Sequence, residues 1–285
     1  MRTFRRPVPT LVGVLAVLVA ASAGCGGGSG GPSEAEALLV AAPGTTIDAG
    51  SARIAVNASI DGQRRGTFAG EGEFAFKTER GRLDLDLGPL GLAGASNTEV
   101  LLDGDLVYLK LGAALPGLKQ RPWVRIDLGT LKAGQGDGIE ALRQLRANDP
   151  RAVINELRGA TGDAAKVGTE TVRGTATTHY RTTVDLDKAA AASPAAVRDD
   201  LAEVARQLGT SKLAMEAWLD VEGRIRRLQY TIDLADLDED APAKRTGTGK
   251  VVATLELYEF GVEVAAEPPP ADQTTDLAEL LGSGN

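Results

Sequence analysis

The chain of 285 residues holds one cysteine and one histidine, and these two residues limit the chemistry that it can perform. A Cys–His nucleophilic pair needs both residues in one site, and a histidine-rich zinc centre needs several histidines, so neither is expected. His179 has the opposite parity to Tyr180 and Val184 in a run with strand periodicity. We therefore expect His179 on the solvated face of a strand, without the partners that a general base requires.

Acidic residues are numerous, but their spacing does not indicate a catalytic or metal site. Asp84 and Asp86 alternate with leucines, as on the wet face of a strand. The cluster from Asp236 to Asp240 lacks the glycine and terminal glutamate of an EF-hand loop, so a charged surface turn is expected. The sequence thus predicts no catalytic residue, no metal and no cofactor.

The setting of Cys25 indicates a different chemistry. Three arginines precede an apolar run from residue 11 to 21, and small residues then lead up to Cys25. This order is typical of a secretory signal. The apolar run is too short to span a bilayer, which takes about 18 or more such residues. We predict that residues 1–24 are a signal peptide.

Small residues followed by cysteine resemble the bacterial lipobox, in which the cysteine sulfur receives a diacylglycerol and becomes the new N-terminus. Cys25 cannot form an intramolecular disulfide, and a free thiol in an oxidising compartment would be reactive. Residues 25–32 continue with glycine and serine, as in a flexible tether. We predict lipidation of Cys25. Ser22 departs from the commonest lipobox, and ordinary cleavage at Ala23 is the alternative.

Charge and composition restrict the partners. The formal net charge is −8, and removal of residues 1–24, which hold three arginines and no acid, lowers it to −11. Such a protein does not favour nucleic acid and is repelled by an anionic membrane surface. We expect its N-terminal acyl chains to anchor it at the extracytoplasmic face of the cell membrane. A hydrophobic content of 43% suffices for a folded core, and we expect a monomer.

Hydrophobic periodicity predicts one α+β domain over residues 33–266, followed by a Pro-rich tail over 267–285 with one helical turn at 276–281. Ser33 and Glu36 form a capping box before a helix that ends at Pro43. Further helices are expected at 139–146, 149–159 and 193–209. The expected antiparallel strands cover residues 52–61, 68–76, 83–87, 101–102, 106–111, 124–128, 167–172, 175–186, 213–221, 225–234 and 251–264.

Three segments are distinctive: Gly174–Arg181 running into Val184–Leu186, Trp218–Arg227, and Pro269–Asp272. Together with the signal, the tether and the order of elements, they resemble the actinobacterial lipoprotein family of LppX, LprA, LprF and LprG. The resemblance implies a strongly curved antiparallel β-sheet, a half-barrel wrapped over a few α-helices, similar to the LolA and LolB lipoprotein carriers. It also implies an apolar cavity that holds acylated lipids or glycolipids.

The residues themselves allow such a pocket, because a curved sheet with one apolar face can leave a gap lined by that face. Each lining residue can equally be plain core. Aromatic residues make up only 4% of the chain, so small aliphatic side chains would fill a large sheet incompletely. The candidate ligand-binding residues are Ile54, Val56, Phe68, Phe74, Phe76, Leu83, Leu85, Leu102, Leu109, Met215 and Leu219.

These features predict a membrane-anchored lipoprotein that binds acylated lipids or glycolipids and carries them across or within the cell envelope. It is not expected to be an enzyme, because no bond is made or broken. The first alternative is an interaction or envelope-sensing lipoprotein with a filled core. A hydrolase is the third alternative, and the sequence shows no residue pair that would serve it.

Overall fold

The computed structural model describes residues 31–62, 66–86, 97–111, 118, 120–130 and 150–282. The predicted signal peptide, Cys25 and the helix expected at 139–146 lie outside the described residues. Residues 32–285 cluster as one unit.

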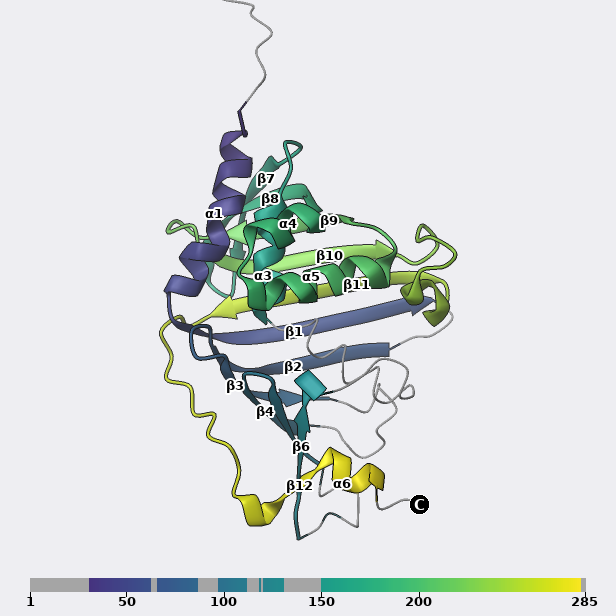
Figure 1. The fold of residues 1–285 in the computed structure, drawn as a ribbon. Helices are drawn as coiled ribbons and strands as arrows, with labels where there is room; N and C mark the ends of the chain where they lie inside the picture. The colour runs from purple at the N-terminus through teal and green to yellow at the C-terminus, as the bar shows by residue number, and fades with distance from the viewer. Residues whose placement is uncertain are drawn as a thin grey trace, which may run out of the picture. The chain divides into compact units, whose positions relative to one another are not determined.

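A sheet of twelve strands runs through the described residues (Figure 1). Its order is β12-β6-β5-β4-β3-β2-β1-β11-β10-β9-β8-β7, and neighbours are antiparallel except for the parallel pair of β12 and β6. No pairing between described residues joins β12 to β7, so the sheet is open. The strands are β1 (Ser51–Gly62), β2 (Gly66–Ala75), β3 (Arg80–Leu85), β4 (Thr98–Asp103), β5 (Leu106–Lys110), β6 (Trp123–Asp127), β7 (Ala165–Val172), β8 (Thr175–Asp185), β9 (Lys212–Leu219), β10 (Ile225–Asp233), β11 (Gly249–Tyr258) and β12 (Thr274–Asp276).

The centre of the sheet joins distant parts of the sequence. β1 lies between β2 and β11, and its Ile54 is opposite Gly72 on one side and Leu257 on the other. Side chains alternate along a strand, so Ile54 is buried while its neighbour Arg53 is exposed. The period of two in the sequence therefore sets which face of β1 turns to the core.

Helices cover one face of the sheet, which we call the inner face (Figure 1). α3, α4 and α5 pack on one another there, and α1 packs beside them against β7 and β10. None of the helices in the described residues is long and apolar enough to cross a membrane. The helices are α1 (Glu34–Asp48), α3 (Pro150–Glu156), α4 (Leu186–Ala192), α5 (Ala195–Leu208) and α6 (Leu277–Gly282), with short 3-10 turns η3 (Leu128–Thr130), η4 (Leu157–Gly159), η5 (Pro242–Thr246) and η6 (Ala271–Gln273).

The main apolar cluster lies between the inner face and the helices. Leu39 of α1, Ile154 of α3 and Leu201 of α5 join Ile54 and Leu228 of the sheet in this cluster, and all five are buried. The expected class, a curved antiparallel sheet over a few helices, is confirmed.

Helix α1 is longer than predicted. Ser33 caps it as expected, since its Oγ accepts a hydrogen bond from the backbone N–H of Glu36 at 3.1 Å. The helix was expected to end at Pro43, and this is wrong, because it continues to Asp48. Pro43 is buried, and Thr46 beyond it accepts a hydrogen bond from the backbone of Ile225. Packing against the sheet thus outweighs the local cost of the proline.

Two further boundaries differ from the sequence expectation. The strand expected to run to residue 186 ends at Asp185, whose side chain caps α4 by accepting from the N–H groups of Asp187 and Lys188. The last long strand was expected to reach residue 264 but ends at Tyr258. Residues 274–276, placed in the tail by the sequence, form β12 beside β6, and the expected final turn is present as α6.

Candidate functional site

The eleven residues predicted to line a pocket come together on the inner face. Eight of them are buried members of the main apolar cluster, and Val56, Phe68 and Leu102 are partly buried against it. They come from β1, β2, β3, β4, β5 and β9 and from the turn after β2, which spreads them across the sheet. The alternation of the strands therefore gathers these side chains into one apolar surface. We call this surface the apolar interior.

Glycines on β2 let the neighbouring strand β3 pack closely against this surface. A β-carbon on Gly70 would lie 2.1 Å from Cδ2 of Leu85, and one on Gly72 would lie 2.0 Å from the carbonyl oxygen of Arg82. Phe68 and Phe74 flank this pair of glycines, so the middle of β2 has no side chain on the inner face. Sequence reasoning missed this role, although glycines two residues apart in a strand are a visible signal.

One ionisable residue is buried beneath the apolar interior. Glu156, the last residue of α3, is 3% exposed, and its Oε2 has no hydrogen-bond partner. Burial raises the pKa of Glu156 to about 8. Burial, and then the charge of Glu156, also raise the pKa of Tyr230 on β10. Tyr230 lies opposite Met215, one of the predicted lining residues.

The sequence did not single out Glu156. The residue is three positions after Val153, which belongs to the apolar stripe of α3, so its spacing places it beside that stripe. A glutamate at such a position is a sign of a buried carboxyl group, but only packing decides whether it is covered.

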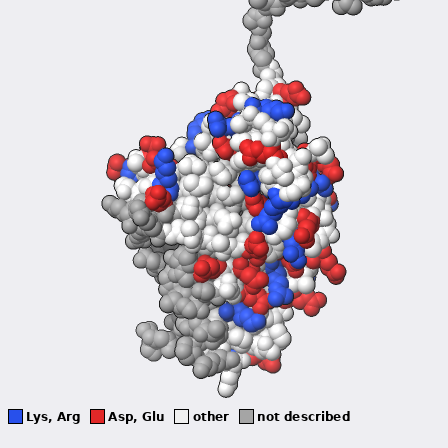
Figure 2. Space-filling model, turned by 180° about the vertical axis from the view of Figure 1, so that it is seen from behind, with Lys and Arg blue, Asp and Glu red and all other residues white. Residues whose placement is uncertain are grey.

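The opposite, outer face of the sheet is charged. Figure 2 shows acidic and basic side chains of both signs in a band on this side of the molecule. Arg173 pairs with Glu256 at 2.6 Å and lies over the ring of Tyr258, with 4.1 Å to its centroid. Arg227 likewise pairs with Glu256 and lies over the ring of Trp218. Paired charges and stacked arginines dominate this part of the face. Leu101, Tyr108 and Trp123 of β4, β5 and β6 form a second, small cluster of buried apolar residues, separate from the main one.

His179 is on this outer face but is not solvated, so the sequence expectation is wrong. It is 6% exposed and stacks on Trp218, with ring centroids 4.1 Å apart. Its Nδ1 lies 2.9 Å from Oε1 of Glu170, and its Nε2 lies 3.4 Å from Oε2 of Glu216. The neighbouring strands β7 and β9 supply these residues, and the parity of β8 alone could not reveal them.

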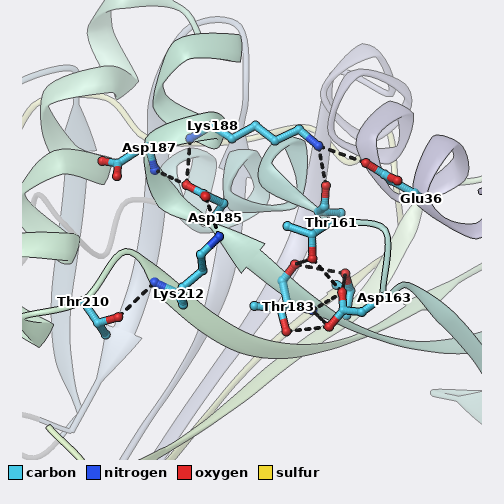
Figure 3. A network of polar contacts seen from close by, with 11 residues as sticks. Glu36, Thr161, Asp163, Thr183, Asp185, Asp187, Lys188, Thr210 and Lys212 are labelled. Carbon is cyan, nitrogen blue, oxygen red and sulfur yellow. Dashed lines mark hydrogen bonds and ion pairs between the residues drawn. The ribbon is translucent and has the colours of Figure 1, made fainter. Parts of the chain in front are cut away.

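A polar network fixes α1 and α4 to the edge of the helix layer (Figure 3). Lys188 of α4 donates to Glu36 of α1 at 2.9 Å and to the carbonyl of Ala160 at 2.7 Å. Asp163 accepts from the hydroxyl of Thr161 and from the backbone N–H of Thr183. Burial opposes ionisation of Asp163, but hydrogen bonds from Thr183 and Thr161 outweigh it and lower its pKa to about 2. The partners are complete, which indicates a structural role.

The described residues hold no group of side chains that is placed to bind a metal ion. No three His, Cys, Asp or Glu side chains in this part of the chain are placed to hold a metal ion. Asp236, Asp238, Glu239 and Asp240 are exposed in the loop between β10 and η5. This matches the surface turn expected from their spacing.

Two Streptomyces proteins are similar to the chain in sequence, while no protein-family model matches it. A 31.2 kDa protein of Streptomyces griseus, encoded between rplA and rplJ, is 29% identical over 187 residues, which cover 63% of this chain and 56% of the relative. A Streptomyces coelicolor protein described as a lipoprotein is 29% identical over 166 residues, covering 57% of this chain and 45% of the relative. The chain thus spans about half the length of the curated relatives it matches.

Solved structures that are similar to this chain are more distant from it in sequence. The lipoprotein LppX of Mycobacterium tuberculosis matches 80% of this chain and 98% of its own, with 16% identity and a TM-score of 0.44. LprF of Mycobacterium bovis matches 85% of this chain and 100% of its own, with 15% identity and a TM-score of 0.46. LppX and LprF, both named by the sequence resemblance, are therefore among the structures to which this chain is similar.

Proposed function

We propose that the protein is an extracytoplasmic lipoprotein that binds acylated lipids or glycolipids against its apolar interior and carries them within or across the cell envelope. The observation that carries the proposal is the convergence of the eleven inner-face residues on one apolar cluster. Burial of each acyl methylene there would contribute about 0.8 kcal/mol, so a few chains suffice for tight binding without polar contacts. The proposal includes no catalytic step.

The anchor is the second part of the proposal. Lipidation of Cys25 would tether the folded unit to the membrane through two or more acyl chains, which bind a bilayer stably. The description of the Streptomyces coelicolor relative as a lipoprotein supports this part. The ion pairs of Arg173 and Arg227 with Glu256 on the outer face support it too, because basic side chains that are already paired attract an anionic membrane only weakly.

A lipid adduct on the purified protein tests the binding proposal. The full chain with Cys25→Ser would be secreted from an actinobacterial host and weighed by native mass spectrometry. Met215→Trp should remove adducts of lipid mass, because Met215 is 1% exposed within the apolar interior. Val221→Trp is the matched control, since Val221 is 95% exposed in the turn after β9.

The melting temperatures of the Met215→Trp and Val221→Trp variants also distinguish a lipid carrier from a protein with a filled core. In a carrier, the added ring of Met215→Trp occupies ligand space, so the lipid-free variant keeps its melting temperature. In a filled core, the ring overpacks and costs about 1–3 kcal/mol. A wild-type chain without adducts, combined with a destabilised Met215→Trp variant, would overturn the proposal in favour of the interaction module.

A further inference from the structure

Glu156 is the one described side chain in the main core whose buried carboxylate oxygen has no partner. Asn155 beside it is equally buried, yet its amide donates to the carbonyl of Arg151 and its carbonyl oxygen accepts from Arg158. Buried polar groups in native proteins are almost always paired, and an unpaired one destabilises the folded state. The unpaired carboxyl group of Glu156 therefore points to a hydrogen-bond partner that is supplied by a bound ligand and not by the protein itself.

The surroundings of Glu156 define what this partner can be. Tyr230 of β10 is close enough for its titration to be affected by Glu156. Tyr230 packs against the main cluster and lies opposite Met215, and Glu156 stands in the sequence between Ile154 and Leu157, two buried members of the same cluster. A cation would be a poor occupant here, because the described residues place no group of three acids, histidines or cysteines that could hold one, and burial of an unpaired charge is costly.

The carboxyl group of Glu156 can donate a hydrogen bond at neutral pH. Burial raises its pKa to about 8, so the proton is retained under physiological conditions. A protonated carboxyl group and a phenol are both O–H donors, and together they match an oxygen acceptor in an otherwise apolar ligand. The ester carbonyl that joins an acyl chain to glycerol or a sugar is such an acceptor.

We propose that Glu156 and Tyr230 form a polar subsite in the apolar interior that hydrogen-bonds an ester carbonyl of the acylated ligand. The inference rests on the proposed function, since it requires that an acylated lipid enters this interior. It goes further because it states where the protein hydrogen-bonds the ligand and which group of the ligand accepts the bond. Such a site distinguishes ester-linked acyl chains from chains without a carbonyl group.

A matched pair of lipids tests the subsite. The ester 1,2-dipalmitoylglycerol and the ether 1,2-di-O-hexadecylglycerol have the same chain length and glycerol hydroxyl, but only the ester has carbonyl oxygens. Their affinities for the full Cys25→Ser chain are measured by competition against a fluorescent acyl probe. A net gain of about 0.5–1.5 kcal/mol for one hydrogen bond corresponds to a preference of roughly two- to twelvefold for the ester.

Variants at Glu156 decide whether this residue causes the preference. Glu156→Leu should bind the two lipids equally, with ether affinity unchanged, whereas Glu156→Gln keeps an N–H donor and should retain part of the preference. Tyr230→Phe should reduce it. If Glu156→Leu keeps the full preference, or loses both lipids together, the subsite is refuted while the lipid-binding function stands. A wild-type chain that binds neither lipid refutes the function itself.

Discussion

At Gly72 the strands β2 and β3 approach so closely that no side chain fits. A β-carbon there would lie 2.0 Å from the carbonyl oxygen of Arg82 and 2.7 Å from Cα of Leu83, both of which are backbone atoms. Gly72→Ala should therefore destabilise the protein by about 2 kcal/mol or more, as overpacking of a core does. Urea unfolding of the variant measures this cost.

Gly168 is the matched control for this prediction. It also lies in a strand, but a β-carbon there would meet nothing within 4 Å. Gly168→Ala should be neutral or slightly stabilising, because alanine reduces the entropy of the unfolded chain. Equal stability of the two variants would contradict the close approach at Gly72.

Glu156 makes stability depend on pH. Burial raises its pKa from the ordinary value near 4.5 to about 8 in the folded state. The stabilisation is therefore complete below pH 4.5 and is lost as pH rises toward 8, because the folded state holds a proton that the unfolded state has released. The free energy of unfolding should fall by up to about 1.4 kcal/mol per pH unit between pH 5 and 8.

The pH profile of Glu156→Gln isolates this effect. Glutamine does not titrate, so the variant should show a flatter dependence over the same range in chemical unfolding at pH 5, 6, 7 and 8. A wild-type profile that is already flat would show that Glu156 reaches solvent or a cation in the folded protein.

Among the elements, α1 depends on one buried hydroxyl. The Oγ1 of Thr46 accepts from the N–H of Ile225 at 2.9 Å and donates to the carbonyl of Ala42 at 2.8 Å. Thr46→Val keeps the shape but leaves the N–H of Ile225 unpaired, which should cost about 1–3 kcal/mol. Thr45 beside it is exposed, so Thr45→Val should change stability by less than about 0.5 kcal/mol. Denaturant unfolding of both variants compares them directly, and similar losses would refute this role of Thr46.

The elements that could be predicted from the sequence are those whose signal is local. Alternation marked the long strands, and Gly209, with a left-handed backbone, ends α5 as expected. Element α4 was missed because its start depends on the side chain of Asp185, and β12 because its only partner is the distant β6. His179 was misplaced for the same reason: its cover comes from Trp218 and Glu170 on other strands.

For the predicted site too, features with a local sequence signal could be predicted, whereas features created by packing of the whole molecule could not. Strand parity was enough to gather the eleven apolar residues, because one face of each strand must turn to the core. Parity could not identify Glu156, because its burial depends on how α3 packs in the folded protein. Nor could it reveal that Glu156 affects the titration of the distant Tyr230. The closeness of β2 to β3 at Gly72 is likewise a property of the assembled sheet.

The location of the whole molecule depends on Cys25 in this account. Its outer face carries paired charges, and the predicted mature chain is strongly acidic, so acyl chains are the expected hold on the membrane. Cys25→Ser should move the protein from the membrane fraction to the medium of an actinobacterial culture. The N-terminal peptide should begin with a diacylated cysteine in the wild-type protein and should carry no acyl chain in the Cys25→Ser variant. Membrane retention of a Cys25→Ser protein from which residues 1–24 have been removed would contradict the anchor.

The most direct measurement of lipid binding in the apolar interior is the position of a photo-crosslink. A diacylglycerol with a diazirine in one acyl chain is bound to the Cys25→Ser chain, irradiated, and mapped by tandem mass spectrometry. We predict label on Phe74 and Met215, which are buried on the inner face, and none on their outer-face neighbours Glu73 and Glu216. Label on the outer-face residues, or label that excess unlabelled lipid does not compete away, would contradict the account.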